Sequence, residues 1–220
     1  MKSYPFSHFP PVPAGQRLGS NENSEMDNLN GCLFRNDAEF DWLYPKKAQL
    51  LSLKHWSPLS VAHKAAEFLA EPGARVLDIG SGIGKFCLTA GYHFPASSFY
   101  GVEQRLELID LAEKAKKYTR LSNVNFIHGN ITQIHFKEFD HFYFYNSFYE
   151  NLDPVNQIDD TIELSESLYS YYTQYLYNAL YEKPPGTRLV TFHSLEQEIH
   201  TSYKLVDFSC DTLLKMWIKQ

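Results

Sequence analysis

Hydrophobic and polar positions change period several times along the chain, beginning near residue 58. Residues 58–70 carry apolar side chains three and four positions apart, which predicts a helix with Pro58 at its start. The next apolar run, residues 74–80, is short and continuous, as in a strand buried on both faces of a parallel sheet. The same alternation continues to the C-terminus. It predicts helices from Lys85, over 105–121 and over 158–181, and strands over 97–103, 123–129, 139–146, 187–192, 203–209 and 212–219.

This alternation predicts an α/β fold with a doubly wound, mostly parallel sheet of seven strands and helices on both faces. The last two strands follow each other without a helix between them. They are therefore expected to form an antiparallel hairpin, with an antiparallel C-terminal strand at the edge of the sheet.

Residues 1–40 differ from the rest of the chain, and the domain is expected to comprise residues 41–220. The first part of this segment is rich in proline and aromatic residues, and the second in Asn, Ser, Asp and Glu. One interpretation is a mobile arm. The other is a lid that folds over a ligand, because Phe6, Phe9 and Phe34 would otherwise face solvent.

Composition narrows the possible partners. The 220 residues include 20 Lys and Arg against 26 Asp and Glu, so the net charge is −6, and nucleic acid is an unlikely partner. The three cysteines form no CxxC pair and the histidines no HxxxH or HExxH pair, which argues against a metal site. No apolar run is long enough to cross a membrane, and the N-terminus has no signal-peptide pattern. A cytoplasmic protein is expected.

The strongest local signal is a glycine-rich loop between the strand at 74–80 and the helix from Lys85. Glycines permit a sharp turn and a close approach to a ligand, so side chains at Gly80 or Gly82 are expected to occupy the ligand's place. Strand–loop–helix is the context in which such loops bind nucleotide-like ligands. The loop's candidate cofactor-binding residues are Asp78, Gly80, Ser81, Gly82 and Gly84.

Two cofactor classes use loops of this kind, and their charge requirements differ. A dinucleotide site requires GxGxxG, but here the third glycine, Gly84, comes one residue early and Lys85 takes its expected place. Asp78 precedes Gly80 by two residues. A carboxylate there repels a pyrophosphate and attracts a cationic sulfonium amino acid. The loop therefore suits S-adenosylmethionine better than NAD.

Polar residues at the ends of the next two strands extend this candidate site. Glu103, 19 residues after Gly84, can accept hydrogen bonds from both ribose hydroxyls, and Gln104 is assigned to the same site. The change Glu103→Ala is expected to weaken cofactor binding by tens to hundreds of fold without loss of the fold. After the third strand, the amide of Asn130 is placed for the adenine amino group, with Ile131 packed on the ring.

These residues resemble the class I, seven-stranded S-adenosylmethionine-dependent methyltransferases. The segments 76–84, 101–103, 129–131 and 142–151 look like that family's successive motifs, and the resemblance covers roughly residues 58–220. It implies S-adenosylmethionine as cofactor, no required metal, and a ligand at the carboxyl ends of the strands. It also implies that Trp56 and Ser57 border the methionine end of the cofactor.

Within that family the looser resemblance is to two groups of enzymes that methylate nitrogen. The segments 78–86, 100–103 and 145–148 are similar to the non-SET protein-lysine methyltransferases. Residues 146–149 also approach the NPPY signature of amide and amine N-methyltransferases but lack both prolines. The resemblance implies that Asn146 orients an acceptor N–H or holds the methionine part of the cofactor, and that Phe148 and Tyr149 flank the acceptor. The structural alternatives are a turn-capping Asn146 and packing of the two rings beneath a loop.

Four functions follow from these observations. The first is N-methylation of a protein side chain of the lysine type, and the second is methylation of a small molecule by the same fold. The third is a methyltransferase-like binding module without catalysis, against which the intact Asp78, Gly80, Gly82 and Glu103 argue. The fourth, an NAD-dependent oxidoreductase, is disfavoured by the glycine spacing. The sequence does not indicate an oligomeric state.

Overall fold

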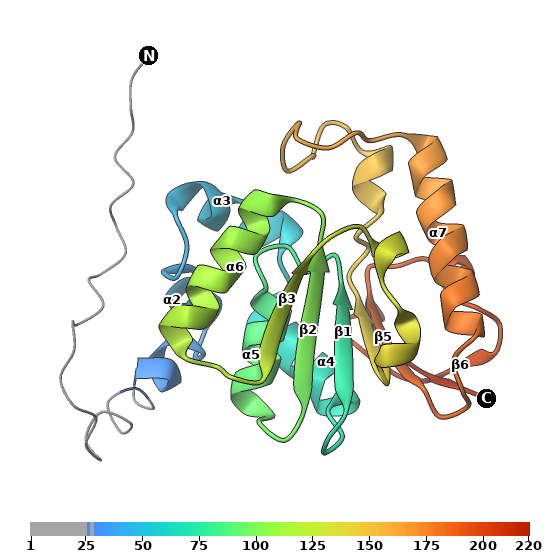
Figure 1. Cartoon of the computed structure of the whole chain (residues 1–220), viewed down its shortest axis with the longest axis horizontal. Helices are drawn as coiled ribbons and strands as arrows, with labels where there is room; N and C mark the ends of the chain where they lie inside the picture. The colour runs from blue at the N-terminus through green and yellow to red at the C-terminus, as the bar shows by residue number, and fades with distance from the viewer. Residues whose placement is uncertain (1–25, 27–28) are drawn as a thin grey trace.

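The computed structural model describes residue 26 and residues 29–220, and its centre is one seven-stranded sheet (Figure 1). The strand order is β3-β2-β1-β4-β5-β7-β6. Strands β1 to β5 are parallel, and β7 is antiparallel to both of its neighbours. The strands are β1 (Arg75–Ile79), β2 (Ser98–Glu103), β3 (Val124–His128), β4 (His141–Phe144), β5 (Arg188–Phe192), β6 (Tyr203–Ser209) and β7 (Leu214–Lys219).

The predicted doubly wound, mostly parallel sheet is confirmed, and so is the antiparallel hairpin at its end. The C-terminal strand is antiparallel, as expected, but it lies one place in from the edge. The hairpin partner β6 takes the edge position because β7 pairs with β5.

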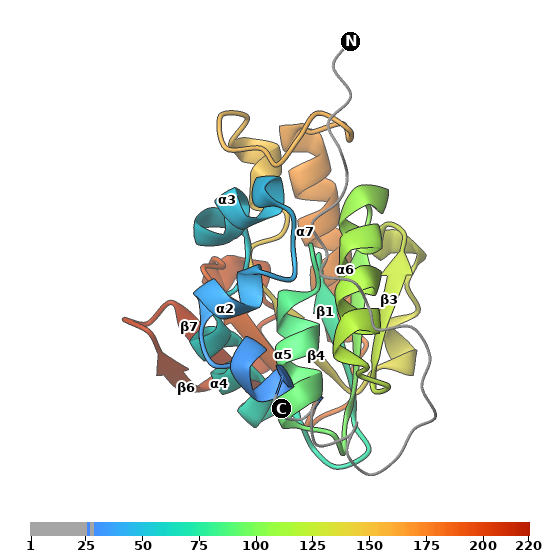
Figure 2. The ribbon, with the colours of Figure 1, turned by 90° about the vertical axis from the view of Figure 1, so that its left-hand side faces the viewer.

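Helices cover both faces of the sheet (Figures 1 and 2). The first group comprises α2 (Asp37–Asp41), α3 (Lys46–His55), α4 (Leu59–Leu69), α5 (Lys85–His93) and α6 (Leu106–Thr119); the second comprises α7 (Glu166–Tyr181) and the 3₁₀ turns η1 (Ile131–Gln133) and η2 (Phe136–Glu138). On β4, Tyr143 packs into the core beneath the first group, whereas Phe142 and Phe144 pack toward α7 on the other face. No helix in the described part of the chain is both long and apolar enough to cross a membrane.

The helix predicted over 158–181 begins later than expected. Residues 158–165 form a loop, and α7 starts only after Ser165, whose Oγ accepts the backbone N–H of Leu168 at 3.2 Å. Within the loop, Asp159 Oδ1 accepts the backbone N–H of Thr161 at 3.1 Å. Such bonds from short polar side chains compete with helix formation, which explains the late start.

The described part of the predicted N-terminal arm packs against the domain. Phe34 stacks on Tyr92 of α5 with ring centroids 4.4 Å apart, and Asn30 Nδ2 donates to the carbonyl of Thr119 at 3.1 Å. Phe40 is fully buried. Residues 29–40 are thus part of the helical layer over α5, and the expectation for residues 1–25, 27 and 28 lies outside the described residues.

Candidate functional site

A cavity of about 560 Å³ opens at the carboxyl ends of the parallel strands, where β1 and β4 lie side by side. The chain leaves β1 toward one side of the sheet and β4 toward the other, and ligands of doubly wound proteins bind at such a point. Of the residues predicted for the site, Gly84 is the one outside the cavity lining. The lining includes Asp78, Gly80, Ser81, Gly82, Glu103, Gln104, Asn130, Ile131, Asn146, Phe148 and Tyr149.

The glycine loop has the backbone that the sequence indicated, with positive φ at Gly80 (74°) and Gly82 (54°). A Cβ on Gly80 would lie 2.4 Å from the Cβ of Ser147, and a Cβ on Gly82 would lie 2.5 Å from the ring of Trp56. Both neighbours line the cavity, so the two glycines let the loop pack closely against other parts of the cavity wall. That a ligand also approaches these glycines stays a prediction.

Ser81 contributes to the loop through its backbone. Its N–H donates to the carbonyl of Val102 at 2.9 Å, while its Oγ is buried over Gly101 of β2. The hydroxyl therefore faces the sheet and not the cavity. The prediction that Ser81 binds the cofactor is consequently limited to its main chain.

The N-terminal helices hold the loop from outside. Tyr44 donates its hydroxyl hydrogen to the carbonyl of Ile83 at 2.9 Å. The buried Lys85, at the start of α5, pairs with Asp37 at 2.7 Å and with Asp41 at 2.9 Å. Lys85 is thus directed toward α2, and its charge is neutralised by protein carboxylates. It is not available to a pyrophosphate.

Glu103 accepts one backbone N–H at each of its carboxylate oxygens. Gly82 donates to Oε2 at 3.1 Å and Arg105 donates to Oε1 at 2.9 Å. Burial raises the pKa of Glu103, and the backbone hydrogen bonds oppose that rise. A carboxylate has about four acceptor positions, so two remain to accept ribose hydroxyls from the cavity.

Asp78 lies deeper, at the end of β1, where the thiol of Cys87 is its hydrogen-bond partner at 3.6 Å. Burial raises its pKa to about 8, and the nearby charge of Glu103 adds to the rise. Two buried carboxyl groups at one end of the cavity make a site that disfavours an anion and favours a cation. This chemistry fits a sulfonium amino acid bound to the loop.

Asn130 meets more protein partners than the sequence indicated. Its Oδ1 accepts the backbone N–H of Thr132 at 3.0 Å, and its Nδ2 donates to Gln104 at 3.2 Å and to Tyr172 at 2.8 Å. The side chain therefore caps η1 and ties it to β2 and α7. Ile131 is buried beside it and lines the cavity, as expected of a residue packed on an adenine ring.

The residues after β4 form the other end of the cavity. Asn146 has a left-handed backbone, with φ 41°, and its N–H donates to Ser194 Oγ at 3.3 Å. The ring of Phe148 is buried, 4.9 Å from that of Phe144 between centroids, so it packs in the core behind the cavity wall. Tyr149 is 47% exposed and stands at the rim.

Several further lining residues escaped the sequence analysis, among them His193 and Arg105. His193 directly follows β5 with φ 55°, and partial burial lowers its pKa. It lies one residue beyond a predicted strand, so the rule that site residues follow strand ends could have found it. Arg105 is buried between β2 and the loop after β4, and no local pattern distinguishes it from other helix-flanking arginines.

A family model described as a methyltransferase domain matches residues 70–209, which is more than half of the chain. The chain belongs to this methyltransferase family. The predicted resemblance to class I methyltransferases is confirmed, and the family carries with it methyl transfer as the enzyme class and S-adenosylmethionine as the cofactor. The glycine loop, Asp78 and Glu103, which are predicted to hold this cofactor, line one cavity.

Solved structures share the fold of this methyltransferase. An RNA methyltransferase from Salinibacter ruber in complex with S-adenosyl-L-homocysteine is 20% identical, with a TM-score of 0.50, over 74% of this chain and 92% of that one. A SAM-dependent methyltransferase from Aquifex aeolicus is 15% identical, with a TM-score of 0.50, over 79% and 96%. TrmN from Thermus thermophilus is 22% identical, with a TM-score of 0.49, over 73% and 52%.

The chain spans about half the length of some of these structures, such as TrmN at 52% and the cyclase SpnF at 43%. No curated protein matches the chain. The comparisons therefore establish family and fold, while the acceptor has to be inferred from the cavity.

Proposed function

We propose that this methyltransferase acts on a nitrogen of a protein side chain, of the lysine type. The observation that carries the proposal is Asp153, a partly buried carboxylate in the cavity lining. Its Oδ2 accepts a hydrogen bond from Asn156 at 2.8 Å, and it pairs with no Lys or Arg in the described part of the chain. An unpaired carboxylate beside a cavity attracts a cationic amine.

Each wall of the cavity has a task in this reaction. S-adenosylmethionine, when bound, supplies a methyl carbon activated by a positive sulfur. Glu103 binds the ribose hydroxyls, and Asp78, whose ionised form is favoured by a bound cation, then adds negative charge at the same end of the cavity. Asn146, held by its turn after β4, presents an amide oxygen that can orient the acceptor N–H. Alignment of two reactants in this way supplies about 7–11 kcal/mol of the barrier reduction.

The acceptor nitrogen has to lose a proton before it attacks. The aromatic lining of Tyr145 and Tyr149 lowers the local dielectric, which favours the neutral amine over the ammonium. His193 lies in the same lining and, because burial lowers its pKa, is neutral near pH 7. It can take up the proton and release it to solvent.

The test is incubation of the protein with S-adenosylmethionine labelled in the methyl group and with a cell lysate separated into protein, RNA and small-molecule fractions. We expect label in the protein fraction, resistant to nuclease and recovered as methyl-lysine after acid hydrolysis. Glu103→Gln and Asp153→Asn should both reduce it, while Asp207→Asn, on the exposed strand β6, should not. Label confined to another fraction would replace the acceptor class, and binding without transfer would indicate the binding module.

A small-molecule acceptor is the second candidate, and one contact favours it. Lys54 Nζ, in the last turn of α3, donates to Asn156 Oδ1 at 2.7 Å, and both residues line the cavity. This bond joins two walls across the site, which leaves a protein side chain less room to enter than a small molecule.

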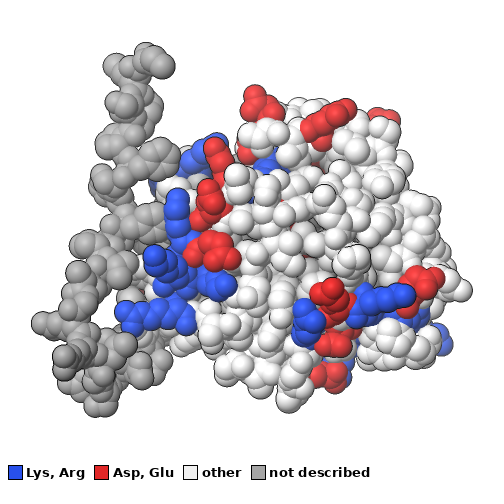
Figure 3. All heavy atoms as spheres, in the orientation of Figure 1, with Lys and Arg blue, Asp and Glu red and all other residues white. Residues whose placement is uncertain are grey.

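The test also includes an RNA fraction, although the proposed acceptor is a protein. The net charge predicted that it is an unlikely partner, but the similar structure from Salinibacter ruber is an RNA methyltransferase, so the prediction gains no support. Figure 3 shows Lys and Arg side chains gathered over α6. The basic side chains lie between positions 114 and 120, and the acidic residues Asp110 and Glu113 are beside them. Lys116 lies 3.9 Å from Glu113, so the charges partly balance, as is usual on a solvent-exposed helix face.

A further inference from the structure

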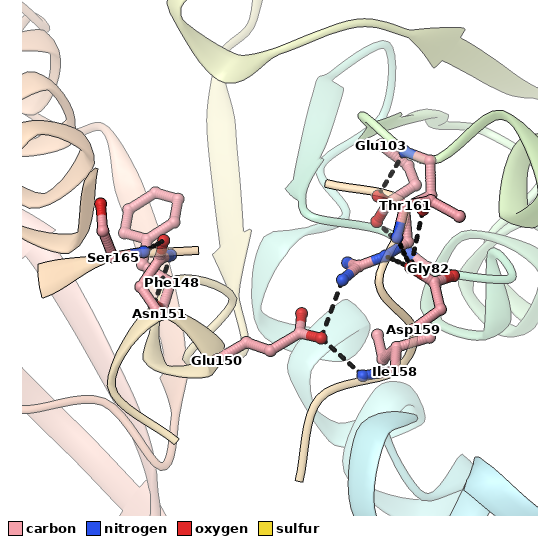
Figure 4. A network of polar contacts seen from close by, with 10 residues as sticks. Gly82, Glu103, Phe148, Glu150, Asn151, Ile158, Asp159, Thr161 and Ser165 are labelled. Carbon is pink, nitrogen blue, oxygen red and sulfur yellow. Dashed lines mark hydrogen bonds and ion pairs between the residues drawn. The ribbon is translucent and has the colours of Figure 1, made fainter. Parts of the chain in front are cut away.

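Arg105 is a buried cation between the cofactor end and the acceptor end of the cavity. Its side chain is 4% exposed. Its backbone N–H donates to Glu103 Oε1, while its guanidinium points away toward the loop after β4. In Figure 4, Glu103 lies on one side of this network and Glu150 on the other. One residue therefore contacts the acid expected to bind ribose and a segment 45 positions further along the chain.

The guanidinium has two carboxylate partners. Arg105 Nη2 lies 2.8 Å from Glu150 Oε1, and Nε lies 2.8 Å from Asp159 Oδ1. The acids are themselves 12% and 11% exposed, so the three charges are largely removed from water. Buried ions require each other, and the planar fork of arginine serves two carboxylates in a way that lysine cannot.

Both acids also bind the backbone of the loop, which we name the cap loop and define as residues 146–161. Glu150 Oε1 accepts the N–H of Ile158 at 2.6 Å, and Asp159 Oδ1 accepts the N–H of Thr161 at 3.1 Å. The guanidinium thus orients two carboxylates that in turn fix the path of the main chain. Without it, two buried anions would face each other without a cation.

The cap loop is the acceptor wall of the cavity. Asn146, Tyr149, Asp153 and Ile158 all belong to it and line the cavity. The position of the groups assigned to the acceptor therefore depends on a cation that is anchored, through its own backbone, to Glu103.

We propose that Arg105 is a positioning residue that couples occupation of the cofactor site to the shape of the acceptor wall. A ligand that engages Glu103 immobilises the Glu103–Arg105 segment and, through the guanidinium, the cap loop. The coupling is reciprocal, so an ordered cap loop strengthens cofactor binding by the same factor. This inference rests on the proposed function, because it assigns the cap loop to the acceptor.

The test is hydrogen exchange over residues 146–161 with and without S-adenosylhomocysteine. The variants are Arg105→Lys, which keeps the charge, and Arg105→Gln, which does not. The control is Arg75→Lys, at the start of β1, whose pair with Glu138 is 3.8 Å long and half-exposed. We expect the ligand to slow exchange of the cap loop about tenfold in the wild type and in Arg75→Lys, less in Arg105→Lys, and not at all in Arg105→Gln.

Two further variants test the same network if Arg105→Gln does not fold. Glu150→Gln should accelerate exchange mainly at Ile158, and Asp159→Asn mainly at Thr161, because each removes the acceptor of one amide. Exchange in β1 serves as the reference for global stability. Equal ligand-induced protection of the cap loop in the wild type and in Arg105→Lys would overturn the proposal.

Failure of this inference and failure of the proposed function give different results. If the wild type does not bind S-adenosylhomocysteine in calorimetry, the proposed function fails. If it binds and the cap loop responds equally in all variants, the coupling fails and the proposed function stands. If it binds and the affinity of Arg105→Gln falls about tenfold together with loss of protection, the reciprocal coupling is confirmed.

Discussion

The Cβ of Ser147 lies 2.4 Å from the point that a Cβ on Gly80 would occupy. Ser147 is the second residue of the cap loop, and its Oγ donates to the carbonyl of Ile79, the residue before Gly80. The glycine loop and the acceptor wall are therefore in direct contact. Their fit depends on the missing side chain of Gly80.

A methyl group at Gly80 should be more harmful than one at a glycine with the same backbone in open space. Gly186 has φ 88° and no atom within 4 Å of a built Cβ, so Gly186→Ala should cost about 1–2 kcal/mol through backbone strain alone. Gly80→Ala adds the clash and should cost about 1–3 kcal/mol more. Urea unfolding measures both values. Equal losses, or no recovery in Gly80→Ala combined with Ser147→Gly, would contradict the role of this contact.

Lys85 should hold the N-terminal helices against the glycine loop. Lys85→Met removes the cation that lies between Asp37 and Asp41, of which Asp41 is 16% exposed. We expect the free energy of unfolding to fall by about 2–4 kcal/mol. Trypsin should also cleave faster at Lys46 and Lys47. Lys64→Met is the control, because its pair with Glu67 is exposed and should contribute less than about 0.5 kcal/mol. Similar losses in the two variants would show that the buried cluster has no special role.

Glu103 should matter for both binding and stability. Glu103→Gln weakens bonds to the ribose hydroxyls, and S-adenosylhomocysteine affinity should fall about 10–100-fold in calorimetry. Glu103→Ala also leaves the N–H groups of Gly82 and Arg105 without their acceptor, so it should lower the free energy of unfolding as well. The expectation that Glu103→Ala leaves the fold untouched is therefore revised. Gln104→Ala, next in the chain, should change the affinity less.

Because of Asp78, the stability of the fold should decrease as pH rises, whereas the affinity for S-adenosylmethionine should increase. Its pKa rises from 3.8 to about 8 on folding, so its stabilising contribution is complete below pH 3.8 and is lost as pH rises toward 8. Between pH 5 and pH 9, the free energy of unfolding of the wild type should therefore fall by about several kcal/mol relative to that of Asp78→Asn.

Binding of a cation favours the ionised form of the same group. S-adenosylmethionine should therefore release a proton from the wild-type protein at pH 7, and its affinity should increase up to about pH 8. Calorimetry in two buffers of different ionisation enthalpy measures the released proton. Proton release that persists in Asp78→Asn would assign it to another group.

Asn146 tests whether the turn after β4 acts in the reaction. Its φ of 41° suits glycine, so Asn146→Gly should leave the free energy of unfolding unchanged or slightly higher. Loss of the amide that orients the acceptor should nevertheless lower methyl transfer about 100-fold. Asn146→Ala combines this loss with backbone strain. Unchanged transfer in Asn146→Gly would restrict the residue to a turn-forming role.

Much of the fold was accessible from local patterns. All seven strands, and the helices after β1 and β2, lie where the period of apolar residues placed them, because burial on one face of a helix or on both faces of a strand is visible within a few residues. The residue at which α7 begins could not be predicted from the sequence. It depends on Asp159, whose hydrogen bond to Thr161 belongs to a network centred on Arg105.

Local sequence patterns were sufficient to predict the sheet, the glycine loop and the acidic residues at the strand ends, since parallel strands bring their carboxyl ends together whatever the details of packing. The surroundings of these residues depend on how distant segments pack. Two of these contacts join residues far apart in the chain: Ser147 packs against Gly80, 67 positions away, and Trp56 packs against Gly82, 26 positions away. The third is Arg105, which links Glu103 to the cap loop across the cavity. Such contacts arise from side chains that share space after folding, and no periodicity along the chain encodes them.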